Sequence, residues 1–197
     1  STTIATTNAL TEQPSFSITS ATTPNAQSGV SMTAPICAVN TTAGRGGGEM
    51  AFRFGCSQLP TGPRVFMGLT GTTFVANTAE PSALTAHYAV LAKDSTDTNL
   101  QFLCNSNAGT GTKIDTGIAL AATGVYECSI WFGPGGNTMR MLLIRLDTGA
   151  IYYGSTATAV PATGTALFPQ IMCGLSSTTG TAIILNFCQA VFRTGAG

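Results

Sequence analysis

Apolar and polar residues alternate along most of this chain with a period of two, which is typical of strands that bury one face. The clearest run covers residues 49–56, where Met50, Phe52 and Phe54 alternate with small or charged residues. Residues 124–132 repeat the pattern. Weaker alternation or short apolar runs occupy residues 64–70, 87–92, 98–105, 138–146, 150–156, 168–175 and 181–193. These segments predict about ten to twelve strands with turn residues between them.

The segments that separate these runs have the composition of turns and loops. Asp147-Thr-Gly149 predicts a hairpin turn, and residues 87–92 and 98–105 are expected to pair across residues 93–97. Residues 78–84 predict a single helical turn, because proline is tolerated at the start of a helix. Many short strands with almost no helix predict an all-β fold, an antiparallel β-sandwich of the jelly-roll type.

The chain divides into two parts of different composition. The first stretch is rich in Thr, Ser, Ala, Asn and Gln, and within it only residues 15–19 alternate clearly. We expect residues 1–45 to form an extended connector or N-terminal arm, and residues 46–197 to form the β-sandwich head domain.

Low charge is the strongest compositional signal. Only 8% of residues are charged, the net charge is zero, and 44% are hydrophobic. Such a surface offers little charge repulsion, so we expect the chain to assemble with copies of itself. The balance of charge excludes a basic footprint for nucleic acid, and no apolar run approaches the roughly 20 residues of a spanning helix. We therefore expect no nucleic-acid partner and no membrane insertion.

Six cysteines are spread evenly through the predicted strands, at positions 37, 56, 104, 128, 173 and 188. Their even number permits disulfides, but each lies within an apolar pattern where a free thiol behaves as a small buried hydrophobe. We favour reduced thiols in a protein made in a reducing cytoplasm.

Catalytic chemistry has few candidates. His87 is the only histidine, and a lone histidine in a strand is more often hydrogen-bonded than catalytic. Asp94 and Asp97 share one turn, where they could act as a glycosidase pair or, with Asn99, bind calcium. Asp and Asn are also ordinary turn formers, which is the interpretation we favour. We expect no enzyme activity, no catalytic residue, no metal and no cofactor.

Two further groups of side chains call for partners. Trp131, the only tryptophan, lies opposite Ile130 in the alternation, so it is either buried or a surface aromatic that contacts a sugar or an interface. Burial between sheets or subunits is the interpretation we favour. Several arginines lie within or beside apolar strands. We expect some of them to pair with Glu49, Glu127 or Asp147, or with another subunit.

Four segments carry a resemblance to a known family. They are Arg64-Val-Phe-Met-Gly-Leu-Thr70, Asp97-Thr-Asn-Leu-Gln-Phe-Leu-Cys-Asn105, Gly111-Thr-Lys-Ile-Asp-Thr-Gly117 and Val125-Tyr-Glu127. Together they resemble the C-terminal head domains of tailed-bacteriophage fibres and virion spikes, over roughly residues 49–193. The resemblance implies a homotrimeric β-sandwich of the virion, assembled in the host cytoplasm, that contacts the host surface. It assigns no residue to receptor contact.

The residues themselves suggest where a receptor would bind. Polar loops that join strong strands offer a variable surface on a rigid scaffold, and three loops fit this description: 93–99, 105–112 and 133–137. We expect them to contact a host-surface glycan or protein through Asp94, Thr96, Asp97, Asn99, Asn105, Asn107 and Asn137. The alternatives are a structural capsid or decoration protein without a receptor, and a glycan hydrolase that uses Asp94 and Asp97.

Overall fold

The computed structural model describes residues 1–197 except 1–14, 41, 43–44, 73–78, 177–179 and 196–197. Thirteen strands and one short 3₁₀ helix, η1 (Pro81–Ala83), make up the described part of the chain. The helical turn expected at residues 78–84 is thus confirmed at its centre. None of the described residues belongs to a helix with the length and apolarity needed to cross a bilayer.

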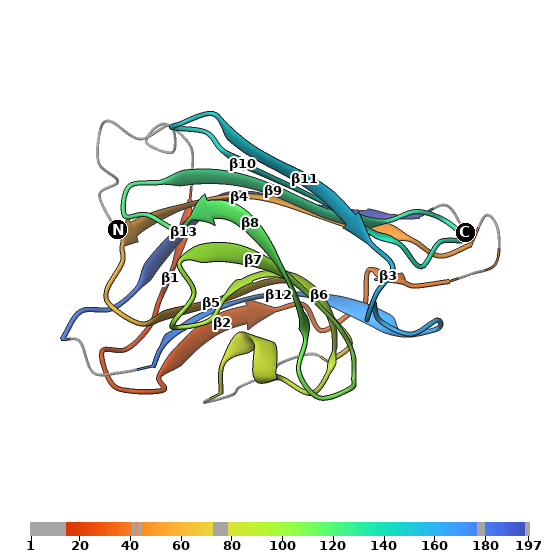
Figure 1. Cartoon of the computed structure of the whole chain (residues 1–197), viewed down its shortest axis with the longest axis horizontal. Coiled ribbons are helices and arrows are strands. Elements are labelled where there is room, and N and C mark those ends of the chain that lie inside the picture. The colour runs from red at the N-terminus through yellow and green to blue at the C-terminus, as the bar shows by residue number, and fades with distance from the viewer. Residues whose placement is uncertain (1–14, 41, 43–44, 73–78, 177–179, 196–197) are drawn as a thin grey trace.

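Two antiparallel sheets pack face to face, as Figure 1 shows, which confirms the predicted all-β antiparallel sandwich. In spatial order the six-stranded sheet contains β1 (Phe16–Thr19), β13 (Ile184–Thr194), β4 (Gly48–Gln58), β9 (Val125–Phe132), β10 (Met139–Arg145) and β11 (Ala150–Thr156). The seven-stranded sheet contains β2 (Gln27–Ser31), β12 (Ala166–Leu175), β5 (Pro63–Thr70), β6 (His87–Lys93), β7 (Asn99–Ser106) and β8 (Thr112–Ala119), with β3 (Cys37–Ala38) beside β12.

The core lies between the sheets and follows the predicted alternation. Met50, Phe52 and Phe54 of β4 are 0–1% exposed. Phe54 stacks on Tyr126 of β9 with ring centroids 4.9 Å apart, and on Phe187 of β13 at 5.8 Å. Stacked rings of this size bury much apolar area and add about 0.5–1.5 kcal/mol per pair beyond it. These three rings pack in the core between the six-stranded sheet, which carries them, and the seven-stranded sheet.

The cysteines are free in the structure, as expected from the sequence. Cys56, Cys104, Cys128 and Cys173 are buried in the core, while Cys37 and Cys188 are half-buried. Burial raises the pKa of the Cys104 thiol to about 12, because the interior disfavours the thiolate. The four buried cysteines therefore pack as small apolar groups of the core.

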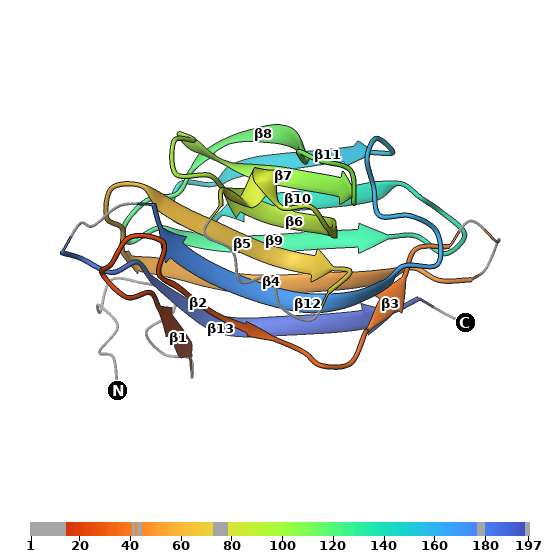
Figure 2. The ribbon, with the colours of Figure 1, turned by 90° about the horizontal axis from the view of Figure 1, so that it is seen from below.

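Residues 15–40 are part of the sandwich. β1 pairs with β13, and β2 and β3 pair with the same edge of β12. Figure 2 shows β1 and β2 together at one side of the molecule, with β8 and β11 at the opposite side. The first 14 residues of the expected connector lie outside the described residues.

A second apolar cluster covers part of the outer face of the seven-stranded sheet. Residues 79–86, which include η1, cross this face between β5 and β6 and bury Leu84 against it. Phe66 and Tyr88 meet edge to face beneath the crossing, with centroids 5.5 Å apart. The other members of the cluster are Ala86, Val90, Ala92, Leu103 and Met172. One outer face of the sandwich is thus partly closed by the chain itself.

Candidate functional site

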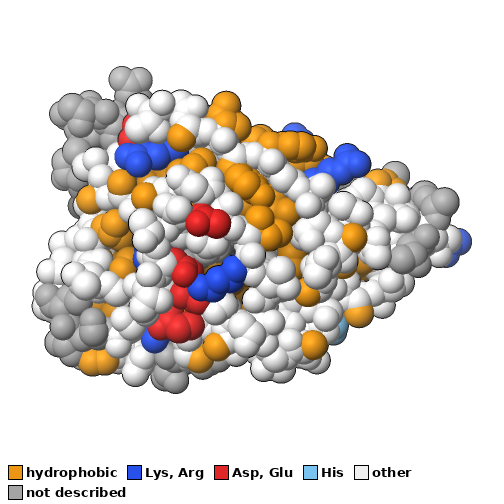
Figure 3. Space-filling model, viewed as in Figure 1, with side chains coloured by type: hydrophobic (Ala, Val, Ile, Leu, Met, Phe, Trp, Pro, Cys, Tyr) orange, Lys and Arg blue, Asp and Glu red, His pale blue; other side chains and the backbone are white. Residues whose placement is uncertain are grey.

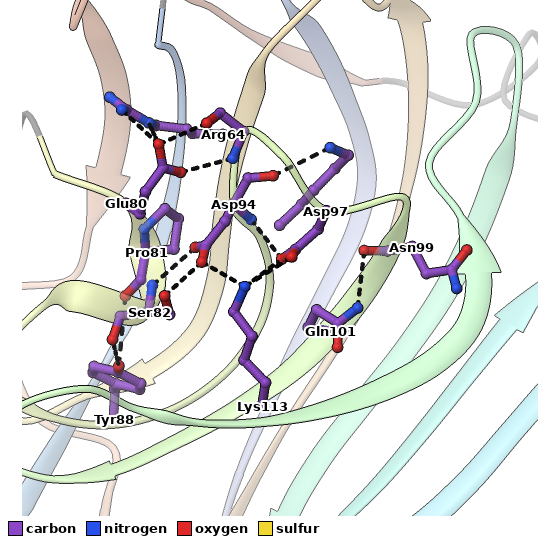
Figure 4. Close-up of polar contacts among 12 residues, drawn as sticks. Arg64, Glu80, Pro81, Ser82, Tyr88, Asp94, Asp97, Asn99, Gln101 and Lys113 are labelled. Atoms are coloured by element: carbon purple, nitrogen blue, oxygen red, sulfur yellow. Dashed lines mark hydrogen bonds and ion pairs between the residues drawn. The ribbon is translucent and has the colours of Figure 1, made fainter.

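The loop carboxylates that the sequence suggested as receptor contacts form a closed ionic network over the seven-stranded sheet, drawn in Figure 4. The Lys113 ammonium lies 2.6 Å from an oxygen of Asp94 and 2.7 Å from an oxygen of Asp97. Asp94 is 4% exposed and also accepts hydrogen bonds from the backbone N–H and hydroxyl of Ser82. Its carboxylate therefore anchors η1 to the β6–β7 turn.

Glu80 forms the second centre of this network. Its carboxylate accepts from the Arg64 guanidinium at 2.7 Å and from the hydroxyl of Ser95 at 2.6 Å. Burial raises the pKa of Glu80, but the hydrogen bonds from Arg64 and Ser95 outweigh burial and hold it below its ordinary value. The red and blue side chains on the lower half of the face in Figure 3 show how closely these opposite charges are gathered.

Asn99 lies at the border of the network, and its side chain contacts β8. Its amide donates to Asp115 of β8 at 3.0 Å. A backbone hydrogen bond from Gly117 and the amide of Asn99 together lower the pKa of Asp115. Thr96 is exposed at the tip of the β6–β7 turn.

The remaining predicted contacts lie elsewhere. Asn105 is 1% exposed and donates to the carbonyl oxygens of Leu84 at 2.9 Å and Gly109 at 3.1 Å, so it shapes the β7–β8 turn from inside. Asn107 is exposed in that turn with φ of 69°, a left-handed conformation that asparagine tolerates. Asn137 is exposed in the β9–β10 loop. Because β7 separates the 93–99 and 105–112 loops, the structure does not gather all seven residues into one surface.

The chemistry available to this network is limited. Asp94 and Asp97 share one ammonium ion, and no group of three or more His, Cys, Asp or Glu side chains within the described residues is placed to hold a metal ion. The imidazole Nδ1 of His87 accepts from the backbone N–H of Ala162 at 3.4 Å, which confirms the expectation that this histidine is hydrogen-bonded. The contacts of this network are made within the chain, and they stabilise this face of the fold.

The outer face of the six-stranded sheet has no covering segment among the described residues, and a groove of about 420 Å³ runs over it. The strand register places Ala51 of β4 directly opposite Ser129 of β9 at its centre. Because these two side chains are small while their neighbours are large, the sheet surface is hollowed there. Three strands, β13, β4 and β9, supply most of the walls of this hollow, which we call the outer groove.

Two ion pairs line the outer groove, as the sequence had suggested for these arginines. Arg53 lies 2.7 Å from Glu127, and Arg193 lies 2.8 Å from Glu49. Glu49 also accepts from the hydroxyl of Ser129 at 2.6 Å. The Arg53 Nε–H is buried and has no hydrogen-bond partner within the described part of the chain. A buried donor without an acceptor is costly to the fold.

Aromatic rings flank these polar groups. Trp131 of β9 is half-buried in the wall of the groove, and Tyr153 of β11 is 64% exposed. Their ring centroids are 6.2 Å apart. Leu142 of β10, which lies between them in the sheet, also lines the groove. Trp131 is therefore a partly exposed aromatic at the rim of the outer groove, and it is not buried between the two sheets, which was one form of the burial that we favoured from the sequence.

Sequence reasoning identified the components of this groove but not the groove. Arg193 and Glu49 are 144 positions apart, and only the pairing of β13 with β4 brings them together. The signal available in the sequence was the alternation that put Trp131 on the face opposite Ile130, together with the shortage of other partners for the strand arginines.

Comparison with known proteins shows the fold. No family model matches the chain, and no curated protein sequence matches it. Among solved structures, the Lotus tetragonolobus seed lectin is 12% identical, covers 90% of this chain and 86% of its own, and superposes with a TM-score of 0.62.

Two other plant lectins are comparably similar. Peanut lectin is 12% identical over 86% of this chain and 80% of its own, with a TM-score of 0.61. Winged bean acidic lectin is 12% identical over 93% and 99% of the two chains, with a TM-score of 0.60. At such low identity the likeness concerns the fold alone. This chain therefore has a β-sandwich fold similar to that of these plant lectins.

Proposed function

We propose that the chain is a glycan-binding head domain of a virion fibre or spike, which attaches to the host surface without catalysis. The observation that carries this proposal is the outer groove, where aromatic rings lie beside paired donors and acceptors. Sugars present apolar ring faces and a rim of hydroxyls, so they bind where a ring can stack and planar polar groups can donate and accept. The similar winged bean lectin was solved with methyl-α-D-galactose.

The groove favours a neutral sugar. Its two arginines are each neutralised by a glutamate, so its four charged side chains sum to zero. Sugar hydroxyls can accept from the exposed Arg193 guanidinium and can donate to the carboxylates of Glu49 and Glu127. We place Trp131 beneath the sugar ring and Tyr153 at the edge of the groove.

The resemblance to phage fibre heads supports the virion setting and a homotrimer. A single shallow groove gives weak binding, whereas three copies of it bound to one glycan-coated surface gain effective concentration. Low net charge agrees with a protein that assembles with copies of itself. A structural capsid or decoration role is the second candidate, which is favoured by the uncovered apolar edge described below.

The test uses the single tryptophan as its own reporter. Neutral hexose glycans are screened on an array, and the best binder is titrated into the protein while Trp131 emission is followed. We expect a saturable change in emission, and at least a tenfold loss of affinity in Trp131→Ala by calorimetry, because stacking on an aromatic ring is removed.

Ile151→Ala is the matched control. Ile151 is 66% exposed on the same sheet but does not line the groove, so this variant should bind as the unmodified protein does. Equal affinity of Trp131→Ala and the unmodified protein would remove the groove from the binding site. An array without any binder, together with unchanged particle adsorption in Trp131→Ala, would remove the glycan-attachment proposal itself.

A further inference from the structure

One edge of the sandwich leaves core-facing side chains uncovered. Phe16 of β1, Val30 of β2 and Phe192 of β13 are 47%, 48% and 37% exposed. Their partners in the strand register are the buried core residues Phe187, Ile171 and Met50. Because paired residues point to the same side of a sheet, these three side chains point between the sheets and are exposed only because nothing described covers this edge.

The uncovered edge is hollow as well as apolar. A groove of about 580 Å³ runs between β1 and β2. Beside it lies a smaller hollow of about 190 Å³ with almost purely apolar walls, and both are lined by Phe16 and Val30. Met32, which is 40% exposed, belongs to the same wall. We call this surface the open edge.

The opposite edge of the sandwich is closed. There β8 and β11 contact each other, and Tyr152 of β11 packs on Phe102 of β7 with centroids 5.9 Å apart. Ile114 of β8 packs against the core from the same side. The open edge is therefore a local feature of β1 and β2, and an edge that exposes core-facing groups is normally covered.

The composition of the open edge points to what covers it. β1 reads Phe-Ser-Ile-Thr and β2 reads Gln-Ser-Gly-Val-Ser, without a charged residue or a proline. Natural proteins guard free edge strands with such residues when the edge must stay single. None of the residues that line the two hollows is charged, so two identical edges can meet without repulsion.

We propose that the open edge is the surface through which copies of this chain associate, with the β1–β2 edge of each neighbouring copy as its occupant. Association covers Phe16, Val30, Met32 and Phe192 and completes the core of each sandwich. It leaves the outer groove free, since that groove lies on the outward face of the six-stranded sheet and its Trp131 rim is on the far side of β4 from β1. Self-association and glycan binding are therefore separate properties of separate surfaces.

Light scattering tests this surface on purified protein. We expect the unmodified chain to have a mass that is a multiple of 20.0 kDa. Val30→Lys puts a charge in the centre of the open edge and should give a single copy, because each interface would bury an unpaired ammonium. Ile151→Lys puts the same charge on β11, at the opposite edge of the sandwich and at a comparably exposed position, and this variant should keep the multimeric mass.

Circular dichroism and urea unfolding establish that the variants are folded, and Met32→Lys replaces Val30→Lys if the latter is not. An unmodified chain that is a single copy at micromolar concentration overturns the proposal. A folded Val30→Lys or Met32→Lys variant that keeps the multimeric mass overturns it as well. An Ile151→Lys variant that loses the multimeric mass has the same consequence. Because Val30→Lys leaves Trp131 untouched, its affinity for a soluble monovalent glycan should be unchanged.

Discussion

The two outer faces of this sandwich differ in how their charged side chains are paired and covered. On the seven-stranded sheet, residues 79–86 cover an apolar cluster, and the carboxylates of Glu80 and Asp94 are enclosed by partners from the same chain. On the six-stranded sheet the face is open, its ion pairs border a hollow, and Arg53 Nε has no acceptor within the described residues. Polar groups that are mutually satisfied stabilise a fold, whereas groups left incomplete beside a cavity are available to a ligand.

The largest expected effect tests the covered face. Phe66→Ala removes a fully buried ring from beneath the crossing segment and should cost about 3–5 kcal/mol of the free energy of unfolding. Trp131→Ala, on the outer face of the six-stranded sheet, should cost about 1 kcal/mol or less of the free energy of unfolding, because surface positions contribute little to stability. Urea denaturation measures both. Similar losses in the two variants would contradict the contrast between the faces.

A smaller loss is expected when the ionic network is broken. Asp94→Asn removes the charge that holds Lys113 and weakens the acceptor for Ser82, so we expect a loss of about 2–3 kcal/mol. Thr96→Ala, in the same turn but exposed, is the matched control and should change stability by less than about 0.5 kcal/mol. Equal unfolding midpoints for Asp94→Asn and the unmodified chain would refute a structural role for this carboxylate.

The network should also affect how the free energy of unfolding changes as the pH falls. The folded pKa of Glu80 lies below its ordinary value of 4.5, so its contribution is fully present above pH 4.5 and is lost as the pH falls through the folded pKa. Glu80→Gln should therefore be less stable than the unmodified chain at neutral pH and should lose less stability on acidification. Unfolding free energies measured between pH 6 and pH 3 test this, and parallel curves would speak against it.

The smallest effect on stability is expected for the ion pairs on the outer face of the six-stranded sheet. The side chains of Arg53 and Glu127 are 30% and 42% exposed, so water screens their attraction. A double-mutant cycle with Arg53→Ala and Glu127→Ala should give a coupling of about 0.2–1 kcal/mol. A coupling as large as the loss in Asp94→Asn would show that this pair has a structural role, and it would weaken the case for a ligand site.

Local pattern was a good guide wherever one sheet face is buried. The alternation of Met50, Phe52 and Phe54 predicted their inward positions, and the hairpin between β10 and β11 forms at Asp147-Thr-Gly149. The shortage of carboxylates led to the expectation that arginines pair with Glu49, Glu127 and Asp147, and all three pairs form. In each case the determining interaction is either local or one of very few available.

The candidate site followed from the sequence less well. Asp94 and Asn105 are polar residues in predicted loops, so we expected both to be exposed, yet both are buried. Residues 79–86 cross the sheet and supply hydrogen-bond partners that sequence spacing does not reveal. A receptor role for the exposed Thr96, Asn107 and Asn137 stays a prediction. Likewise, the outer groove depends on the register that sets Ala51 opposite Ser129, and a shift of one residue between β4 and β9 would put these two side chains on opposite faces of the sheet.

The sequence by itself determined that this chain forms many short strands with few charges, and it favoured free thiols, because these properties depend on residue type and a period of two. Only the tertiary structure decided which face is covered, which carboxylates are enclosed and where a hollow opens. Those outcomes depend on the pairing of strands that are more than a hundred residues apart, such as β4 with β13 and β5 with β12. Such pairing is fixed by the completion of a common core and not by any local pattern.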